Sequence, residues 1–230
     1  MAQIDLESEL LNFISNGHYE PGDRLPTIAE LQTEERLGLS TSKIREQLEV
    51  ARALGMVEVR SKTGMRLKEY SFAPAVRLSL FFALAKDLGH FELFSELRKH
   101  VEIAFWHEGC ALLTGEDKAE MRACVEQANR KLNDEWIQIP NAEHRQFHMI
   151  VFRRLNNPFV VGILEAYWDA YDAVELNRYS DYDYLQRVWE YHAHILDSIC
   201  EGDIDAAQQH YIEHTQLLRY QPRMRDMHKP

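Results

Sequence analysis

Cysteine is scarce in this sequence: its 230 residues include three, at Cys110, Cys124 and Cys200. They are scattered without a Cys-x-x-Cys spacing, which argues against a disulfide framework, and we interpret them as small buried apolar groups. Long hydrophobic runs are also missing, because no window approaches the roughly eighteen consecutive apolar residues needed to cross a bilayer. The acidic start MAQIDLESEL does not resemble a signal segment. We therefore expect a cytoplasmic protein without a membrane partner.

Positive charge is the minority charge, since 26 Lys and Arg oppose 37 Asp and Glu and the formal net charge is -11. This total argues at first against nucleic acid, whose phosphates need basic side chains. Between residues 36 and 68, however, only three acids are present, and the balance is reversed. The basic residues of this island are Arg36, Lys43, Arg45, Arg52, Arg60, Lys62, Arg66 and Lys68. A DNA-binding segment inside an acidic protein is therefore possible on charge alone.

Three short helices are predicted at the N-terminus, each followed by a glycine that can end it. Thr27 can cap the second helix, with Glu30 reaching back from the third position, and Ser40 or Thr41 can cap the third. The predicted segments are 5–17, 27–38 and 40–55. Residues 56–70 then alternate apolar and polar side chains around a Lys-Thr-Gly turn, which is typical of a two-stranded ribbon. This order predicts a winged helix-turn-helix domain over residues 1–69.

The rest of the chain has helical periodicity and no competing strand pattern. Seven helical segments, separated by Gly, Asn, Asp or Pro, follow residue 75. Pro74 disfavours helix at the residue before it, so residues 70–75 are predicted to be a linker. The fold class is therefore mainly α, with a winged helix-turn-helix followed by an all-α antiparallel bundle over residues 76–230 that can enclose a cavity.

In a winged helix-turn-helix, the third helix enters the major groove and the wing contacts the flanking backbone. Basic and polar side chains occur at both places in this sequence. The candidate DNA-contacting residues are Ser40, Thr41, Lys43, Arg45, Lys62, Thr63, Gly64 and Arg66. The alternative is that the charged members are simply solvated surface groups.

Several ordered motifs give the chain a wider resemblance. GHYEPGDRLPTIAEL, LGLSTSKIREQLEVARALGMVEV and KTGMRL resemble the N-terminal domain of GntR-family transcriptional regulators. QFHMIVFRRLNNP and HILDSICEGDIDAAQQHYIEH are similar to the ligand-binding (FCD) domain of the FadR branch of that family. The resemblance covers almost the whole chain and implies DNA binding.

The resemblance has matches and departures at single positions. Arg45 matches the DNA-reading arginine of the family, and Gly64 matches the wing glycine. Thr41 stands where the family usually has an arginine, and Ala29 stands where it usually has a polar residue. These departures leave the operator sequence open.

Two histidines stand four residues apart in the segment NAEHRQFHMIVF, at His144 and His148. Residues at this spacing share one face of a helix, so both rings can be directed at a single point. The pair suits a metal site, but two histidines among apolar neighbours also suit a hydrogen-bonded core.

The family resemblance adds two further histidines to this pair. FadR-branch domains that bind metal have single histidines on their last two helices, and His192 and His214 fall at these positions. The family usually places Asp where this chain has His144. The resemblance therefore implies an all-imidazole site, which favours zinc or nickel over magnesium or calcium. His194 and His210 should point elsewhere.

An effector site is implied by Arg98, which matches the arginine of the family's ELR motif. A guanidinium binds a carboxylate through two parallel hydrogen bonds. Spacing alone equally favours an ion pair with Glu102, four residues further along the helix. The aromatic residues Tyr167, Trp168 and Tyr171 could line the same cavity or belong to the core.

These patterns predict a homodimeric, effector-responsive regulator that is not an enzyme. We expect it to be a repressor that binds a palindromic double-stranded operator and is released by a small carboxylate bound near the metal. One alternative is a metal-dependent hydrolase, although Glu143, the acid nearest His144, should project away from the histidine face. A second alternative is a constitutive DNA binder with a structural metal.

Overall fold

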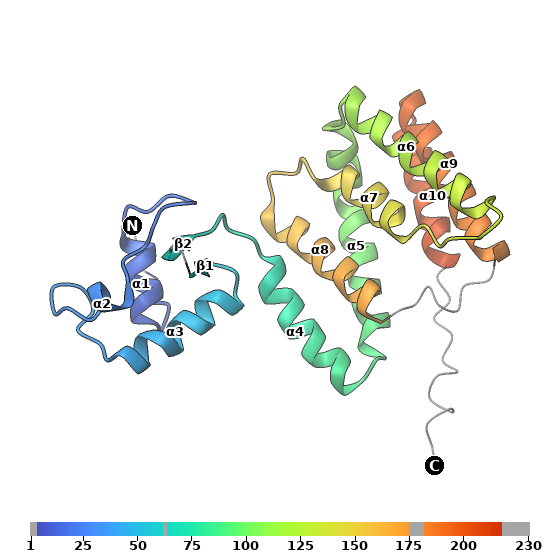
Figure 1. Cartoon of the computed structure of the whole chain (residues 1–230). Helices are drawn as coiled ribbons and strands as arrows, with labels where there is room; N and C mark the ends of the chain where they lie inside the picture. Colours follow the sequence, from blue (N-terminus) through green and yellow to red (C-terminus); the bar gives the residue numbers. More distant parts are fainter. Residues whose placement is uncertain (1–3, 62–63, 175–181, 218–230) are drawn as a thin grey trace, which may run out of the picture. The chain divides into compact units, whose positions relative to one another are not determined.

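The computed structural model describes residues 4–61, 64–174 and 182–217, and the chain divides into two compact units, residues 1–79 and 80–230 (Figure 1). The described helices and strands confirm the mainly helical fold class with one small hairpin. They are α1 (Glu9–Asn16), α2 (Ile28–Leu31), α3 (Thr41–Ala53), β1 (Val57–Arg60), β2 (Gly64–Leu67), α4 (Ala73–Lys86), α5 (His90–Ala111), α6 (Gly115–Leu132), α7 (Asn141–Phe152), α8 (Pro158–Ala173), α9 (Tyr182–Glu201) and α10 (Ile204–Leu217). Within these ranges, none of the helices combines the length and the apolar character needed to span a bilayer.

The N-terminal unit is held together by a small apolar core and one buried amide. Leu31 and Ile44 are fully buried, which fixes α2 and α3 against each other. Gln47 on α3 accepts hydrogen bonds from the backbone N of Leu10 (2.8 Å) and the hydroxyl of Ser8 (3.1 Å). The bond from Leu10 satisfies a backbone N–H in the first turn of α1 that has no partner within the helix. Both bonds set the position of α1 on α3.

The second helix is much shorter than the predicted segment 27–38. Thr27 and Glu30 form the expected capping box, but α2 ends at Leu31 and turns follow up to Gly38. The hydroxyl of Thr33 donates to the carbonyl of Glu30 (2.9 Å), and the N–H of Gly38 donates to the carbonyl of Thr33 (3.0 Å). A threonine side chain that bonds the backbone locally competes with the helix, and this accounts for the early end.

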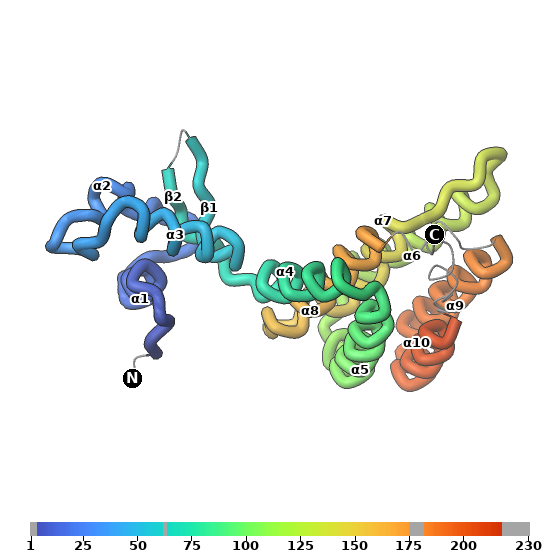
Figure 2. Tube along the Cα trace, turned by 90° about the horizontal axis from the view of Figure 1, so that it is seen from below, coloured from blue at the N-terminus to red at the C-terminus, as the bar shows by residue number. Residues whose placement is uncertain are grey.

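The wing is an antiparallel hairpin in which Val57 pairs with Leu67 and Arg60 with Gly64. The connector before α2 adds to its edge, because Leu25 N donates to Met65 O (2.9 Å) and Gly22 N donates to Leu67 O (2.8 Å). Figure 2 shows the two strands extending beyond the helices of the N-terminal unit. The sequence prediction of a winged helix-turn-helix is therefore confirmed.

The predicted linker, residues 70–75, is not entirely extended, because α4 begins at Ala73. Residues 73–75 form the first turn of a 14-residue helix, and the division between the two units falls inside this helix. Proline is tolerated in the first turn, where its missing N–H would have no helical partner. The last three residues of the predicted linker are therefore helical.

Figure 1 shows the helices α5 to α10 of the C-terminal unit. Their largest apolar cluster includes Trp106, Phe152 and Trp189, and a second cluster joins the end of α4 to α5 and α8. The long helix α5 contacts α7, α8 and α10, and α6 contacts α7 and α9. A side-chain Cβ at Gly109 on α5 would lie 2.6 Å from the carbonyl oxygen of Val151 on α7. The glycine therefore permits the close approach of α7, the helix with the paired histidines, to α5.

Candidate DNA interface and metal centre

The N-terminal end of α3 presents the first group of candidate DNA-contacting residues. Ser40 is the N-cap, and its hydroxyl accepts from the backbone N of Lys43 (3.3 Å). Thr41 is half-buried, Lys43 lies 3.5 Å from Glu46, and Arg45 is exposed. Among the described residues, no hydrogen bond or ion pair engages the guanidinium of Arg45. Ser40 therefore caps α3, whereas the side chain of Arg45 is available to contact DNA.

The wing presents a second group. Gly64 has φ +76°, a left-handed conformation that favours glycine, and Arg66 donates from Nη1 to the carbonyl of Gly22 (2.6 Å). One nitrogen of the Arg66 guanidinium therefore holds the connector against the wing, and the others remain for contacts with DNA. Two further candidates, Lys62 and Thr63, lie outside the described residues.

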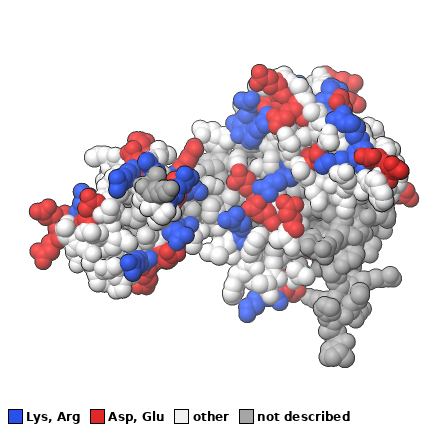
Figure 3. Space-filling view, in the orientation of Figure 1, with Lys and Arg blue, Asp and Glu red and all other residues white. Residues whose placement is uncertain are grey.

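Sequence reasoning missed Arg24, which lies in the connector outside the basic island. Its Nε is 3.5 Å from the point where a Cβ would stand at Gly64, so its exposed charge lies beside the wing. The arginine is visible in the sequence motif PGDRLP, but its position beside the wing follows only from the pairing of the connector with β2. Figure 3 shows basic side chains in several groups on this face of the N-terminal unit, with acidic ones between them.

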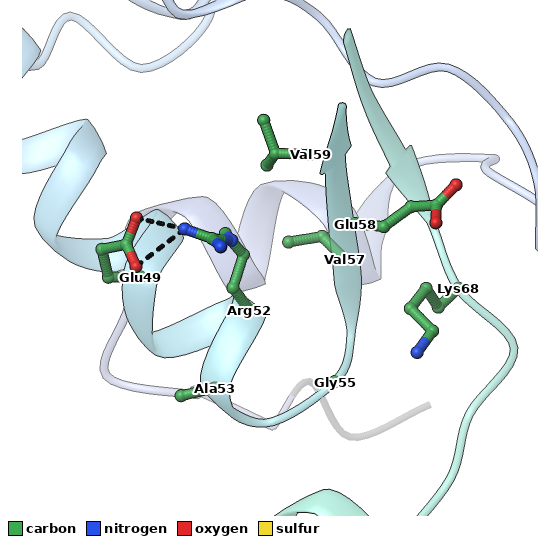
Figure 4. Close-up of a pocket in the computed structure, with 8 residues that line it drawn as sticks. All are labelled: Glu49, Arg52, Ala53, Gly55, Val57, Glu58, Val59 and Lys68. Carbon is green, nitrogen blue, oxygen red and sulfur yellow. Dashed lines mark hydrogen bonds and ion pairs between the residues drawn. The ribbon is translucent and has the colours of Figure 1, made fainter. Parts of the chain in front are cut away.

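A shallow hollow lies between the C-terminal end of α3 and β1 (Figure 4). Arg52 crosses its edge and donates from Nη1 to both carboxylate oxygens of Glu49, at 2.7 and 2.9 Å. Its lining includes Glu58 and Lys68. Both partners of the Glu49–Arg52 pair are largely exposed, so the hollow contains no buried charge that would single it out as a ligand site.

The four candidate histidines converge in the C-terminal unit, as the sequence analysis predicted. His144 and His148 project from α7, His192 from α9 and His214 from α10. Their exposed fractions are 7%, 2%, 0% and 0% in chain order. Each ring offers one nitrogen, and these four nitrogens all lie within 4.8 Å of one another.

The spacing of the nitrogens suits one small cation. Zinc–nitrogen bonds of about 2.0–2.1 Å in a tetrahedron imply ligand-to-ligand distances of about 3.4 Å. The Nε2 atoms of His148 and His192 are already 3.2 Å apart. The rings of His192 and His214 have centroids 4.5 Å apart. Small side-chain movements therefore suffice to bring four imidazoles around one ion.

The histidines are held in the neutral form that a metal requires. Burial, aided by the neighbouring imidazoles and Arg98, lowers the pKa of His144, His148 and His214 well below the ordinary histidine value. Burial likewise lowers the pKa of His192 to about 3. A metal ion binds an unprotonated nitrogen, and each neutral imidazole has one, so no ring has to lose a net positive charge before it can bind near pH 7.

Unpartnered nitrogens show that the residues fit a metal. Nε2 of His144 and both ring nitrogens of His214 are buried and have no hydrogen-bond partner. Buried polar atoms without partners are costly, and an ion that accepts their lone pairs removes that cost. Nδ1 of His192 lies 2.6 Å from the carbonyl of Val188, to which only a protonated nitrogen can donate. This bond orients the ring and leaves its Nε2 free as a ligand.

Arg98 lies against this cluster. Its Nη2 is 3.1 Å from Nδ1 of His148, and its Nε is 2.7 Å from Oε2 of Glu102. Both members of the ion pair are buried, and the hydroxyl of Tyr211 also donates to Oε2. Burial disfavours the charge of Arg98, but the Glu102 carboxylate, together with the nearby Tyr211 and Tyr167, outweighs this effect and raises the pKa of the guanidinium. The intrahelical pair considered in the sequence analysis is therefore present.

Glu102 and Tyr211 were not among the predicted site residues. Glu102 entered the sequence analysis only as the alternative partner of Arg98, although it is fully buried beside the cluster. Tyr211 stands three residues before His214 and therefore shares its helix face. That spacing was the available signal, but it gives no indication that the hydroxyl meets a carboxylate from α5.

Aromatic rings form one wall of the site. The guanidinium of Arg98 lies 4.7 Å from the ring centre of Tyr167 and 5.3 Å from that of Trp168. Both rings are buried, as is Tyr171. They therefore belong to the core and also line the site. His144, the least buried of the four clustered histidines, also lines a small pocket with Asn141, Tyr184 and Trp189.

The remaining candidates lie outside the cluster. His194 is exposed, and its ring lies 5.3 Å from that of His210. Neither histidine belongs to the set of converging nitrogens. Glu143 forms an ion pair with Lys131 at 2.8 Å. The acid next to His144 in sequence is therefore engaged by a lysine and is not one of the groups that converge with the four histidines.

A winged helix-turn-helix joined to a helical domain that encloses a buried cluster of four histidines is an architecture of bacterial transcriptional regulators. Residues 4–67 match the family described as bacterial regulatory proteins, gntR family, and residues 93–217 match the FCD domain family. The chain belongs to the GntR family of regulators and to its FadR subfamily, which carries the FCD domain.

Similar proteins agree with this assignment. The HTH-type transcriptional regulator YcbG of Bacillus subtilis is 23% identical over 91% of this chain and 85% of its own. The Uxu operon transcriptional regulator of Escherichia coli is 25% identical over 87% of this chain and 79% of its own. Streptococcus agalactiae GntR, a solved structure, has the same fold with a TM-score of 0.65 at 21% identity, covering 91% and 94% of the two chains. These relatives are regulators, not enzymes.

Proposed function

We propose that this DNA-binding regulator is a metal-containing homodimeric repressor, which leaves a palindromic operator when a small carboxylate binds near the metal. The observation that carries the proposal is the buried cluster of four histidines with unpartnered nitrogens. The cluster is in the unit without the helix-turn-helix, so its role is to sense a ligand rather than to contact DNA.

Zinc or nickel is the ion that this donor set favours. The four converging ligands are neutral imidazoles, and the carboxylate oxygens that magnesium and calcium prefer are not among them. When bound, the ion supplies a positive charge that attracts an anion and, if one coordination position stays open, a direct bond to it.

A carboxylate is the anion that the surrounding side chains favour. Arg98 is buried, charged and in contact with the metal ligand His148. A guanidinium can bind a carboxylate through two hydrogen bonds, and Tyr167 and Trp168 exclude water beside it. The effector releases DNA if it binds more tightly to the arrangement of the two recognition helices that does not fit the operator.

Two copies of the recognition helix would bind two half-sites one helical turn apart, and the symmetry of the protein would be mirrored in a palindrome. The relative from Escherichia coli is named for the operon that it regulates. By analogy, we infer that this chain controls an operon for the transport or oxidation of the carboxylate that it senses.

A DNA-binding assay on the DNA upstream of the gene tests this function. We expect the zinc-loaded protein to shift this DNA, and citrate, malate, lactate or a sugar acid from a test panel to release it. Treatment with a chelator should abolish the response to the acid. If none of the acids changes the fraction of DNA bound, with or without metal, the result would instead support a constitutive DNA binder with a structural metal.

Arg45→Ala should weaken operator binding by about 1–3 kcal/mol, or roughly fivefold to 150-fold in Kd. Arg45 is exposed and no described residue engages its side chain, so the fold and the metal content should not change. Fluorescence anisotropy with labelled operator measures the effect. Arg52→Ala is the matched control, because it removes the same charge from the same helix at the paired, C-terminal position. Equal losses in the two variants would contradict a specific role for Arg45.

A further inference from the structure

A chain of hydrogen bonds links Arg98 to the backbone of α9 through two of the metal ligands. Arg98 Nη2 lies 3.1 Å from His148 Nδ1, and His148 Nε2 lies 3.2 Å from His192 Nε2. His192 Nδ1 lies 2.6 Å from Val188 O. The chain therefore begins at a group that can only donate and ends at a group that can only accept.

The chemistry of its two ends fixes every proton in the chain. A guanidinium has no acceptor, so His148 Nδ1 must accept and carries no proton. A carbonyl has no donor, so His192 Nδ1 carries a proton and the Nε2 of this neutral ring accepts. The proton between the two rings therefore belongs to His148 Nε2. With these contacts in place, His148 is the Nε2–H tautomer.

This tautomer cannot bind the ion. His148 Nε2 faces His192 Nε2 at the point where the ligand nitrogens converge, so it is the nitrogen that must be free of a proton. A neutral ring can free it only by carrying the proton on Nδ1. Nδ1 would then place its N–H against the donor Arg98, so that contact has to break.

A carboxylate oxygen of Glu102 is a buried acceptor close to the N–H that His148 Nδ1 would then carry. Oε1 of Glu102 is 3.9 Å from His148 Nδ1 and has no hydrogen-bond partner. The other oxygen, Oε2, already receives the hydroxyl of Tyr211 and faces Arg98. A small rotation of either side chain brings Oε1 within hydrogen-bonding distance of Nδ1.

We propose that Glu102 is a positioning residue for His148: when Nε2 of this ring is free to serve as a metal ligand, Nδ1 would carry the proton and donate it to Oε1 of Glu102 instead of facing Arg98. The proton moves from Nε2 to Nδ1 of the same ring, so no net charge is gained or lost. The Nη2 edge of Arg98 loses its acceptor and becomes available to a carboxylate. This inference rests on the metal site of the proposed function, and it adds an order of events: metal first, then acid.

The test is the tautomer of His148 in the full-length protein. Long-range proton–nitrogen NMR of ¹⁵N-histidine-labelled protein distinguishes a protonated ring nitrogen from a bare one, and a His148→Gln sample identifies the resonances. We expect a proton on Nε2 in the metal-free protein and a proton on Nδ1 after addition of zinc alone. An Nδ1 proton before zinc, or an Nε2 proton after it, would overturn the inference and leave the metal site intact.

Variants supply a second readout, the affinity for zinc measured by competition with a chelator. Glu102→Gln should weaken zinc binding about tenfold to a hundredfold, which is typical when the partner of a ligating histidine is lost. Tyr211→Phe is the matched control, because it removes the bond to Oε2 and leaves Oε1 in place. An unchanged affinity in Glu102→Gln would contradict the role of Glu102. Failure of the unaltered protein to bind zinc would instead overturn the proposed metal site and this inference together.

Discussion

Adding zinc to chelator-treated protein should raise the melting temperature of the C-terminal unit by about 8–16 °C when free zinc is a thousandfold above its Kd. At that ratio, a ligand that binds only the folded state stabilises it by about 4 kcal/mol, and each kcal/mol shifts the midpoint by roughly 2–4 °C in a unit of this size. All four tryptophans, Trp106, Trp136, Trp168 and Trp189, lie in this unit. Intrinsic fluorescence therefore follows its unfolding separately from that of the N-terminal unit.

His148→Ala should abolish most of this shift and lower the metal content, because it removes one of the two ligands that are already at a coordinating distance. His194→Ala is the matched control, since it removes an exposed histidine outside the cluster. Metal content is measured on the dialysed proteins. Full zinc occupancy and an undiminished shift in His148→Ala would remove this residue from the site.

Acidification should destabilise the metal-free C-terminal unit by on the order of 5 kcal/mol between pH 7.5 and pH 5.5. The pKa values of the four buried histidines are lowered in the folded state, whereas in the unfolded chain they return to about 6.5. Below that pH the unfolded chain binds more protons than the folded one, so stability falls as the pH falls. Each histidine contributes about 1.4 kcal/mol at one pH unit below 6.5.

Urea unfolding at a series of pH values, followed by tryptophan fluorescence, measures this effect. His214→Gln provides the internal control, because removing one of the four groups should reduce the loss by about a quarter. A free energy of unfolding that is constant over this pH range would mean that the imidazoles titrate normally inside the fold.

The prediction of the fold from sequence succeeded where local signals agree with tertiary packing. The capping residues Thr27 and Ser40 predicted the starts of α2 and α3 correctly. The end of α2 could not be predicted in the same way, because Thr33 bonds the backbone locally. The start of α4 at Ala73 was not anticipated, because the rule for the residue before proline disfavours helix there, whereas proline is tolerated in a first helical turn.

The four metal candidates illustrate the limit of spacing arguments. The i, i+4 relation of His144 and His148 places both on one face of α7, but nothing in periodicity connects them to α9 and α10. The family resemblance supplied that connection, and the geometry confirms the convergence. The role of Glu102 could not be predicted, because its unpartnered Oε1 results from the packing of α5 against α7 and α10.

X-ray absorption spectroscopy at the zinc edge is the most direct measurement of the central claim, that one buried ion joins four imidazoles. In the zinc-loaded protein we expect nitrogen neighbours at about 2.0–2.1 Å with the outer-shell scattering of four imidazole rings. A sulfur neighbour at about 2.3 Å, or scattering from two or fewer imidazoles, would contradict the account.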